Sequence, residues 1–299
     1  MIAILSFLSL IGNAFAKCPT VKSQKMGTVD SGQINEISGL IATENTLWVH
    51  NDSGDSPTLY ALSTNGIHKG TVNITNAFAR DWEAMTSFTK DGQQYFLIGD
   101  VGDNKERKGM VTFYVIKAPT HFNDIKADYS FTGTYDIGSK DVEAMFVDPI
   151  DNSLYLLSKG RDGQHHILKS AIPEQPPILE NPIEAKTTAP PDVQFSTVYS
   201  KKWSDLPIPK NQQSQYITDA AIHHDGTLIV RRNYLSASLW VRTDNQSIDE
   251  LLQTKPCKIP LPLQPQGESI AFSPNGQYLW TISEGSNPFV YQIELNFEQ

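Results

Sequence analysis

Five short segments of the chain place a polar residue directly before small and apolar residues. Two of these segments are nearly identical, Asp81-Trp-Glu83-Ala-Met and Asp141-Val-Glu143-Ala-Met. The polar residues that align are Ser38, Glu83, Glu143, Asp219 and Glu268. If their side chains face one another, four carboxylates lie close together, and either some of them take up protons or a cation lies among them.

The chemistry of these side chains indicates which cation fits. A hard divalent cation prefers oxygen ligands, and Ca²⁺ tolerates irregular coordination best. No histidine or cysteine shares the aligned positions, which argues against zinc. We therefore predict one Ca²⁺ held by Ser38, Glu83, Glu143, Asp219 and Glu268. A plainer alternative stays open, in which some of these carboxylates cap turns or pair with arginines.

The elements around each segment form a repeat. A second apolar run follows each segment, usually after a turn signal such as Lys90-Asp91-Gly92 or Pro274-Asn275-Gly276, and a polar loop and a third run come next. The second runs are 46–49, 94–98, 153–157, 226–230 and 277–282, and the third runs include 58–62, 111–116, 238–241 and 289–293. Residues that favour β-strands dominate these runs, and no amphipathic helical stretch stands out.

Repeated units of three or four strands predict an all-β fold, a β-propeller. Five blades follow from the five segments, and six fit if an irregular blade lies in 171–210. The last unit stops after its third strand, so residues 20–29 could add the outer strand and close the ring. Alternation alone would also fit a sandwich, but the repeated acidic start favours the propeller. The first strand of every blade lines the central channel, which would bring the aligned residues to one axis.

The loops after the second strands should open on the same face as the aligned residues. They carry candidates for proton transfer, which are His50, Asp52 and Asp100. They also carry candidates for substrate binding, which are Asp55, Asp103, Asn104, Arg107, Lys159, Arg161, Arg231, Arg232, Tyr234 and Glu284. The arginines among them could hold phosphate or carboxylate with forked donors. His50 is equally well interpreted as a hydrogen-bonded structural histidine.

The ends of the chain predict export. Residues 2–11 form an apolar run and Ala14-Phe15-Ala16 resembles a signal cleavage site, so we expect a signal peptide at 1–16 and one propeller domain at 17–299. The product would be periplasmic or secreted. The chain has two cysteines, Cys18 and Cys257, and an oxidising compartment favours a disulfide between them. Two free buried thiols are the alternative.

The formal net charge of −9 limits the class of partner. Nucleic-acid phosphates and anionic membrane surfaces both require a basic protein face, so neither is expected. No later segment has the length and apolar character of a membrane span. We expect a monomer that acts on, or binds, a small anionic molecule.

Several of these motifs together resemble a family of exported bacterial propeller proteins that are loosely described as phytase-like or esterase-like. The motifs are His50-Asn-Asp-Ser-Gly-Asp55, Asp81-Trp-Glu83, Gly99-Asp-Val-Gly-Asp-Asn104 with Arg107, Asp141-Val-Glu143-Ala, and Gly267-Glu268 with Ser283-Glu-Gly285. The family often has Arg-Thr-Tyr where this chain has Arg232-Asn233-Tyr234. The aligned polar residues also resemble the axial calcium site of the five-bladed calcium-activated nucleotidases, which is a likeness of fold.

Two functions follow as hypotheses. The first is a Ca²⁺-dependent hydrolase of a small anionic ester, such as a phosphoester, with a lactone or carboxylic ester as a variant substrate. The second is a non-catalytic propeller that binds a ligand or a protein and carries a structural Ca²⁺.

Overall fold

The computed structural model describes residues 18–174, 190–202, 212–243 and 246–297. The predicted signal peptide, residues 1–16, lies outside this part of the chain. The same is true of most of the proline-rich stretch at 173–192 and of part of the region considered for a sixth blade.

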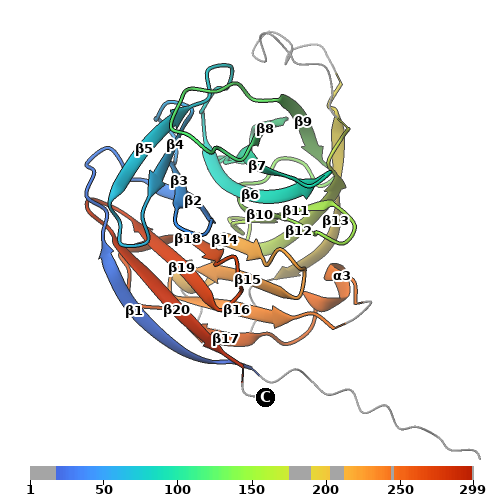
Figure 1. Ribbon diagram of the computed structural model, residues 1–299. Coiled ribbons are helices and arrows are strands. Elements are labelled where there is room, and N and C mark those ends of the chain that lie inside the picture. Colours follow the sequence, from blue (N-terminus) through green and yellow to red (C-terminus); the bar gives the residue numbers. More distant parts are fainter. Residues whose placement is uncertain (1–17, 175–189, 203–211, 244–245, 298–299) are drawn as a thin grey trace, which may run out of the picture.

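The regular secondary structure of the described chain is almost entirely β-strand (Figure 1). One four-stranded sheet has the order β2 (Ile37–Ala42), β3 (Leu47–Asn51), β4 (Thr58–Leu62) and β5 (His68–Asn73). A second has the order β14 (Ile217–Ile222), β15 (Leu228–Asn233), β16 (Ser236–Val241) and β17 (Cys257–Pro260). Two short helices, α2 (Gln212–Gln215) and α3 (Ile248–Leu251), flank that second sheet.

An eight-stranded sheet joins two further meanders through their outer strands. The first meander is β6 (Trp82–Lys90), β7 (Gln93–Asp100), β8 (Val111–Lys117) and β9 (Tyr129–Tyr135). The other is β10 (Val142–Val147), β11 (Ser153–Ser158), β12 (Gln164–Ala171) and β13 (Val193–Lys202). Strands β13 and β9 pair in parallel, and a Cβ on Gly133 would lie 2.7 Å from the Phe195 ring, so this junction requires a glycine.

The remaining sheet unites the two ends of the chain. Its order is β1 (Thr20–Thr28), β20 (Phe289–Asn296), β19 (Tyr278–Glu284) and β18 (Gln266–Phe272). Strand β1 runs antiparallel to β20 along nearly its whole length. The prediction that residues 20–29 add an outer strand to the last unit is confirmed.

The first strands of the meanders meet at the centre of the molecule. Strands β2, β6, β10, β14 and β18 each pack against the next, and β18 packs against β2 (Figure 1). This closed ring of inner strands, with the other strands radiating outward, is the arrangement of a β-propeller. The predicted all-β propeller is therefore observed.

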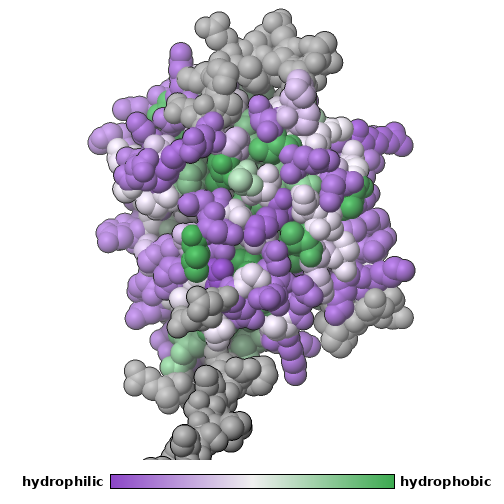
Figure 2. Space-filling model, turned by 90° about the vertical axis from the view of Figure 1, so that its right-hand side faces the viewer, coloured by the Kyte–Doolittle hydropathy of each residue, from purple (hydrophilic) through white to green (hydrophobic). Residues whose placement is uncertain are grey.

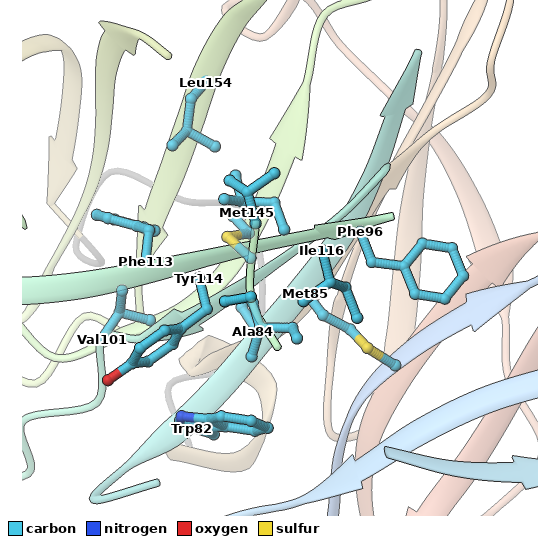
Figure 3. Close-up of a cluster of buried hydrophobic side chains, with 14 of the residues drawn as sticks. Trp82, Ala84, Met85, Phe96, Val101, Phe113, Tyr114, Ile116, Met145 and Leu154 are labelled. Atoms are coloured by element: carbon cyan, nitrogen blue, oxygen red, sulfur yellow. The ribbon is translucent and has the colours of Figure 1, made fainter. Parts of the chain in front are cut away.

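The core explains why the inner strands lack a clear alternation of polar and apolar residues. Every residue of β10 is buried, because both faces of an inner strand pack against other parts of the ring. Figure 3 shows one apolar cluster, in which Trp82 and Met85 of β6 lie near Phe96 and Tyr114 of the adjoining strands. Burial of such large side chains contributes most of the favourable free energy of folding.

The hairpin turns fall where glycine and asparagine or aspartate predict them. Asp91 and Gly92, between β6 and β7, have φ values of 51° and 77°. Two consecutive positive φ values match the twist of an antiparallel hairpin, and Asp-Gly is a favoured pair there. Gly226 and Gly276 take positive φ values of 78° and 68° at the equivalent turns.

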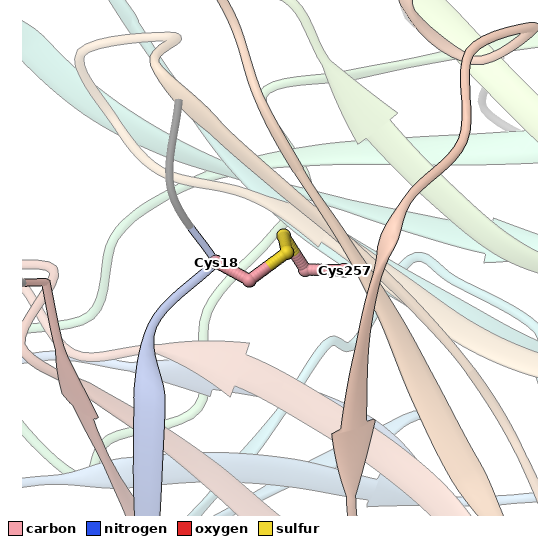
Figure 4. The surroundings of a disulfide bond; sticks show 2 residues. All are labelled: Cys18 and Cys257. Carbon is pink, nitrogen blue, oxygen red and sulfur yellow. A yellow bond between two sulfur atoms is a disulfide. The ribbon is translucent and has the colours of Figure 1, made fainter. Parts of the chain in front are cut away.

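A disulfide joins Cys18, just before β1, to Cys257, the first residue of β17, with 5.4 Å between their Cα atoms (Figure 4). The predicted pairing is confirmed, and it ties the outer strands of two neighbouring sheets together.

The face shown in Figure 2 is mostly hydrophilic, with hydrophobic atoms in small separate groups. No helix in the described residues has the length and hydropathy needed to cross a membrane.

Candidate metal centre at the mouth of the ring

A β-bulge interrupts every inner strand at the start of its pairing with the second strand. The register shifts fall between Ile37 and Gly39, and at the equivalent places of the other four strands. The residues inserted by these bulges are Ser38, Glu83, Glu143, Thr218 and Glu268. A bulge turns the side chain of its extra residue away from the regular alternation, which is how bulges place residues at functional sites.

The register corrects one position of the sequence alignment, because Thr218, and not Asp219, is equivalent to Ser38 and the three glutamates. The Thr218 hydroxyl donates to the Gly267 carbonyl oxygen at 2.9 Å, as the Ser38 hydroxyl donates to the Glu83 carbonyl oxygen at 2.7 Å. Asp219 accepts hydrogen bonds from the backbone N–H groups of Ile270 (2.6 Å) and Ala220 (2.7 Å). Its carboxylate is thus occupied in joining β14 to β18.

The loops after the second strands do open on the same face as the bulges. In three of the sheets the same hydrogen bond recurs. A backbone N–H of the loop, at Asp52, Gly102 or Lys159, donates to the carbonyl oxygen of the residue just before the inner strand of the same meander. The acceptors are Glu36 (2.7 Å), Asp81 (3.2 Å) and Asp141 (2.8 Å), respectively. This shared pattern fixes each loop over the start of its own inner strand.

Three carboxylates from these elements could hold a metal ion. One oxygen each of Asp52, Asp81 and Glu83 lies within 4.8 Å of the others, and Asp81 and Glu83 are buried. A Cβ on Gly102 would lie 2.8 Å from Asp81 Cγ and 2.6 Å from Glu83 Cγ, so only a glycine lets the loop backbone approach this closely. Lys108 donates to Asp81 at 2.7 Å and also to the Gly102 carbonyl oxygen. Carboxylate oxygens in a small, partly desolvated cluster are a donor set suited to a hard cation.

The wider group of acids around this triad is called the acidic mouth here and consists of Asp52, Asp81, Glu83, Glu143, Glu268 and Glu284. Burial raises the pKa of Glu83 well above its usual range, and the charge of Glu143 adds to the rise. Burial also raises the pKa values of Asp52, Glu143 and Glu268. For Glu284, burial and the nearby Glu268 raise the pKa to about 7. Clustered carboxylates with raised pKa values are typical of functional sites.

Lys159 already supplies one positive charge to the acidic mouth. Its ammonium donates to Glu143 at 2.8 Å, and both side chains are largely buried. Burial by itself would lower the pKa of Lys159, but the charges of Glu143 and Glu268 outweigh it and raise the pKa. Lys159 was predicted to hold a substrate anion, and in this structure its nearest partner is a carboxylate of the protein.

Most of the other cationic side chains that were predicted to bind the substrate also have partners within the protein. Arg161 pairs with Asp141 and contacts Asn104. Arg231 lies 5.5 Å from the centre of the Trp240 ring, in a cation–π contact.

Arg232 is buried, and its guanidinium donates to the Ser269 carbonyl oxygen at 3.0 Å and to the Thr281 hydroxyl. Burial lowers the pKa of Arg232 to about 10, so the group stays charged at neutral pH. Arg107, by contrast, is exposed and has no ion pair among the described residues.

The remaining predicted site residues have contacts with neighbouring residues of the protein. Asp55 accepts from the Tyr60 hydroxyl at 2.7 Å. Asp103 accepts from the backbone of Lys108, and Asp100 is fully buried near Arg80. Burial, followed by the charge of Glu268, raises the pKa of Tyr234.

His50 is a buried residue of β3 and does not belong to the loop that follows this strand. It is fully buried, its Nδ1 lies 2.9 Å from the Asn51 carbonyl oxygen, and its ring meets Trp82 edge-on at 5.7 Å. Burial lowers the pKa of His50 to about 4. A Cβ on Gly39 would lie 2.3 Å from Nε2, so the imidazole is tightly enclosed. This placement favours the alternative interpretation of His50 as a structural histidine.

The buried His50 should make the fold sensitive to acid. With a folded pKa of about 4 and an ordinary pKa of 6.5, the unfolded chain binds the proton first as the pH falls. The stability that neutral His50 contributes is present above pH 6.5 and is lost as the pH falls toward 4. Between pH 6.5 and 4.5 we expect the loss of unfolding free energy to be about 2 kcal/mol smaller in His50→Gln than in the parent, measured by urea unfolding with chelator. Identical pH dependence in both proteins would contradict this.

Asp81 and Thr218 were missing from the predicted site residues. Asp81 belongs to the Asp-x-Glu pattern that recurs as Asp141-Val-Glu143, and this recurrence was the available signal. Thr218 could not be found, because Ile217-Thr-Asp219 offers a carboxylate one position later, and only the pairing register separates the two.

The comparisons with known proteins assign no family. No family model and no curated protein matches the chain. Among solved structures, a crystal structure of RRP9 WD40 repeats is similar over 92% of this chain and 100% of its own, with 10% sequence identity and a TM-score of 0.45. The resemblance to the exported bacterial propellers stays a prediction, and the fold assignment follows from the chain's own strand pairing.

Proposed function

We propose that this protein is a five-bladed propeller that binds Ca²⁺ at Asp52, Asp81 and Glu83 and hydrolyses a small anionic ester. The count of five is supported by the five inner strands of the ring, each with one bulge, and by the eight-stranded sheet dividing into two meanders at the β13–β9 pairing.

The observation that carries the metal proposal is the triad itself. Its three carboxylates come within 4.8 Å of one another around the closely approaching Gly102 backbone, and burial raises the pKa values of Asp52 and Glu83. A divalent cation would relieve this repulsion, and Ca²⁺ accepts such an irregular oxygen set. Glu143 and Glu268 interact with the charge of Lys159. We therefore do not include them among the metal ligands, although their charges act on the site.

The hydrolase proposal rests on what surrounds the triad. A bound cation would attract a phosphoester or carboxylic ester and polarise it. Arg107, exposed in the loop that follows Gly102, is available to hold the anion. Glu284, with a pKa of about 7, suits proton transfer near neutral pH better than the enclosed His50.

A non-catalytic propeller with a structural ion is the second candidate. Lys108 and Lys159 already compensate part of the negative charge, which is what an ion with a purely structural role would also do. In either case we propose export to the periplasm or medium, supported by the disulfide, because such bonds persist in oxidising compartments.

Calorimetric titration with Ca²⁺ tests the metal site. Asp52→Asn and Glu83→Gln should each weaken Ca²⁺ binding at least about tenfold, because each removes one anionic ligand. Glu44→Gln, an exposed change at the opposite end of the first sheet, is the matched control and should leave the affinity unchanged. Equal Ca²⁺ affinity in all four proteins would reject the site.

Catalysis is tested separately on the Ca²⁺-loaded protein. A screen of phosphoesters, nucleotides, lactones and aryl esters should show turnover that chelator abolishes. Ca²⁺ binding without any turnover would favour the non-catalytic candidate. Turnover that persists in chelator would reject the metal-dependent mechanism.

A further inference from the structure

A cavity of about 360 Å³ lies at the opposite end of the strands from the acidic mouth. It is bordered by the β2–β3 turn at Thr46, by the start of β7 at Gln94 and by Phe122, which follows β8. It therefore lies between the β2–β5 sheet and the adjoining β6–β9 meander, whose positions can be followed in Figure 1. A volume in this range accommodates a molecule built on one ring.

Three aromatic side chains form one wall of this cavity. Trp48 contacts Phe96 and Phe122, with 6.1 Å between ring centres in both pairs. Phe122 is 45% exposed, and a Cβ on Gly70 would lie 2.4 Å from its Cγ. One side of the Phe122 ring thus lies against the glycine backbone, and a large apolar part of the ring stays accessible. Such a surface favours stacking with a flat ring.

The polar side chains of the cavity complement a negative ligand. Of the residues that line it, all within the described part of the chain, Lys69 alone is charged. Its ammonium donates to the Asn45 carbonyl oxygen at 3.1 Å and to the Thr46 hydroxyl at 2.6 Å, which leaves the third of its three donors available. A cavity lined by one lysine and no acid favours an anion over a cation.

We propose that this cavity binds a small ligand that carries a carboxylate on a single ring, either aromatic or a sugar ring with a C–H face. The ring lies against Phe122, and the carboxylate accepts from Lys69. This chemistry occurs in an aromatic acid and in a sugar acid, and benzoate and glucuronate represent the two sources. The site is independent of the acidic mouth, so chelator leaves it unaffected.

Ligand-observed NMR and calorimetry with benzoate and glucuronate test the proposal. We expect saturable binding of at least one of them, at least about tenfold tighter than binding of its neutral counterpart, benzamide or glucose. Stronger binding of benzoate identifies an aromatic acid, and stronger binding of glucuronate identifies a sugar acid. No saturable binding of either acid at about 10 mM, or equal affinity for the neutral counterpart, overturns the proposal.

Two substitutions locate the binding. Phe122→Ala and Lys69→Met should each weaken binding of the preferred acid at least about tenfold. Phe289→Ala, which removes a ring of similar exposure (41%), and Lys22→Met, which removes an exposed lysine of β1, are the matched controls and should bind like the parent. Thermal unfolding verifies that all four variants are folded. Unchanged affinity in folded Phe122→Ala or Lys69→Met places the ligand elsewhere and overturns the proposal.

Discussion

Replacing both cysteines by serine, in Cys18→Ser/Cys257→Ser, should lower the unfolding free energy by about 4 kcal/mol and the melting temperature by roughly 10 °C. The bond joins residues 239 positions apart, so the unfolded chain gains a large amount of freedom when it is removed. In the folded protein it holds the start of β1 against β17, at the place where the two ends of the chain close the ring.

Thermal and denaturant unfolding of the parent, the double variant and the parent with reductant measure this effect. The reduced parent should unfold like the double variant, because both lack the same bond. Amide hydrogen exchange should accelerate first in β1 (Thr20–Thr28). Without the disulfide, this strand is held in its sheet only by its pairing with β20. Equal melting temperatures for the oxidised parent and the double variant would contradict the role of this bond in closing the ring.

Lys159→Met should cost about 3 kcal/mol of unfolding free energy at neutral pH in the absence of metal. The ammonium lies 2.8 Å from a Glu143 carboxylate whose side chain is 1% exposed. Removing the ammonium leaves that carboxyl group buried near Glu83 and Glu268 with no described cation in contact, so it must either stay ionised without a partner or take up a proton, and both cost free energy. An uncompensated buried charge is far more costly than the loss of a solvent-exposed ion pair.

A matched control and a compensating change separate this effect from a simple loss of packing. Lys169→Met removes an ammonium from a more exposed pair with Asp151, at 3.3 Å, and should cost less than about 1 kcal/mol. Adding Glu143→Gln to Lys159→Met should recover most of the loss, because the neutral amide needs no counter-charge. Equal losses in Lys159→Met and Lys169→Met, or a double variant no more stable than Lys159→Met, would disprove the electrostatic account.

The repeat pattern was sufficient to predict much of the fold. Turn residues such as Asp91-Gly92 and the apolar runs that flank them define hairpins through local backbone preference, so the strands could be placed from sequence. The incomplete last unit predicted the closure by β1, and the even pair of cysteines predicted the disulfide. The outer strands β5, β9, β13 and β17 were not placed individually, because their composition is mixed. Burial is also only partial in β5, β13 and β17.

The candidate site was only partly predictable. Glu83 and Asp52 were both singled out from sequence, but in different roles, and Asp81 was not chosen at all. The interpretation of His50 depended on burial, and that of Lys159 depended on whether a carboxylate lay within reach of its ammonium. Neither quantity can be derived from residue type and spacing.

The amino-acid sequence by itself determined the inner strands and most of those next to them, their turns and the recurrence of a polar residue at the start of each unit, because these depend on local preference and periodicity. Only the tertiary structure decided which polar residue each bulge inserts, as at Thr218, which carboxylates lie close enough to hold a cation, and which carboxylate pairs with Lys159. The physical reason is that register and electrostatic neighbourhood are set by contacts between distant strands. A shift of one residue along a strand then changes which side chain reaches the axis.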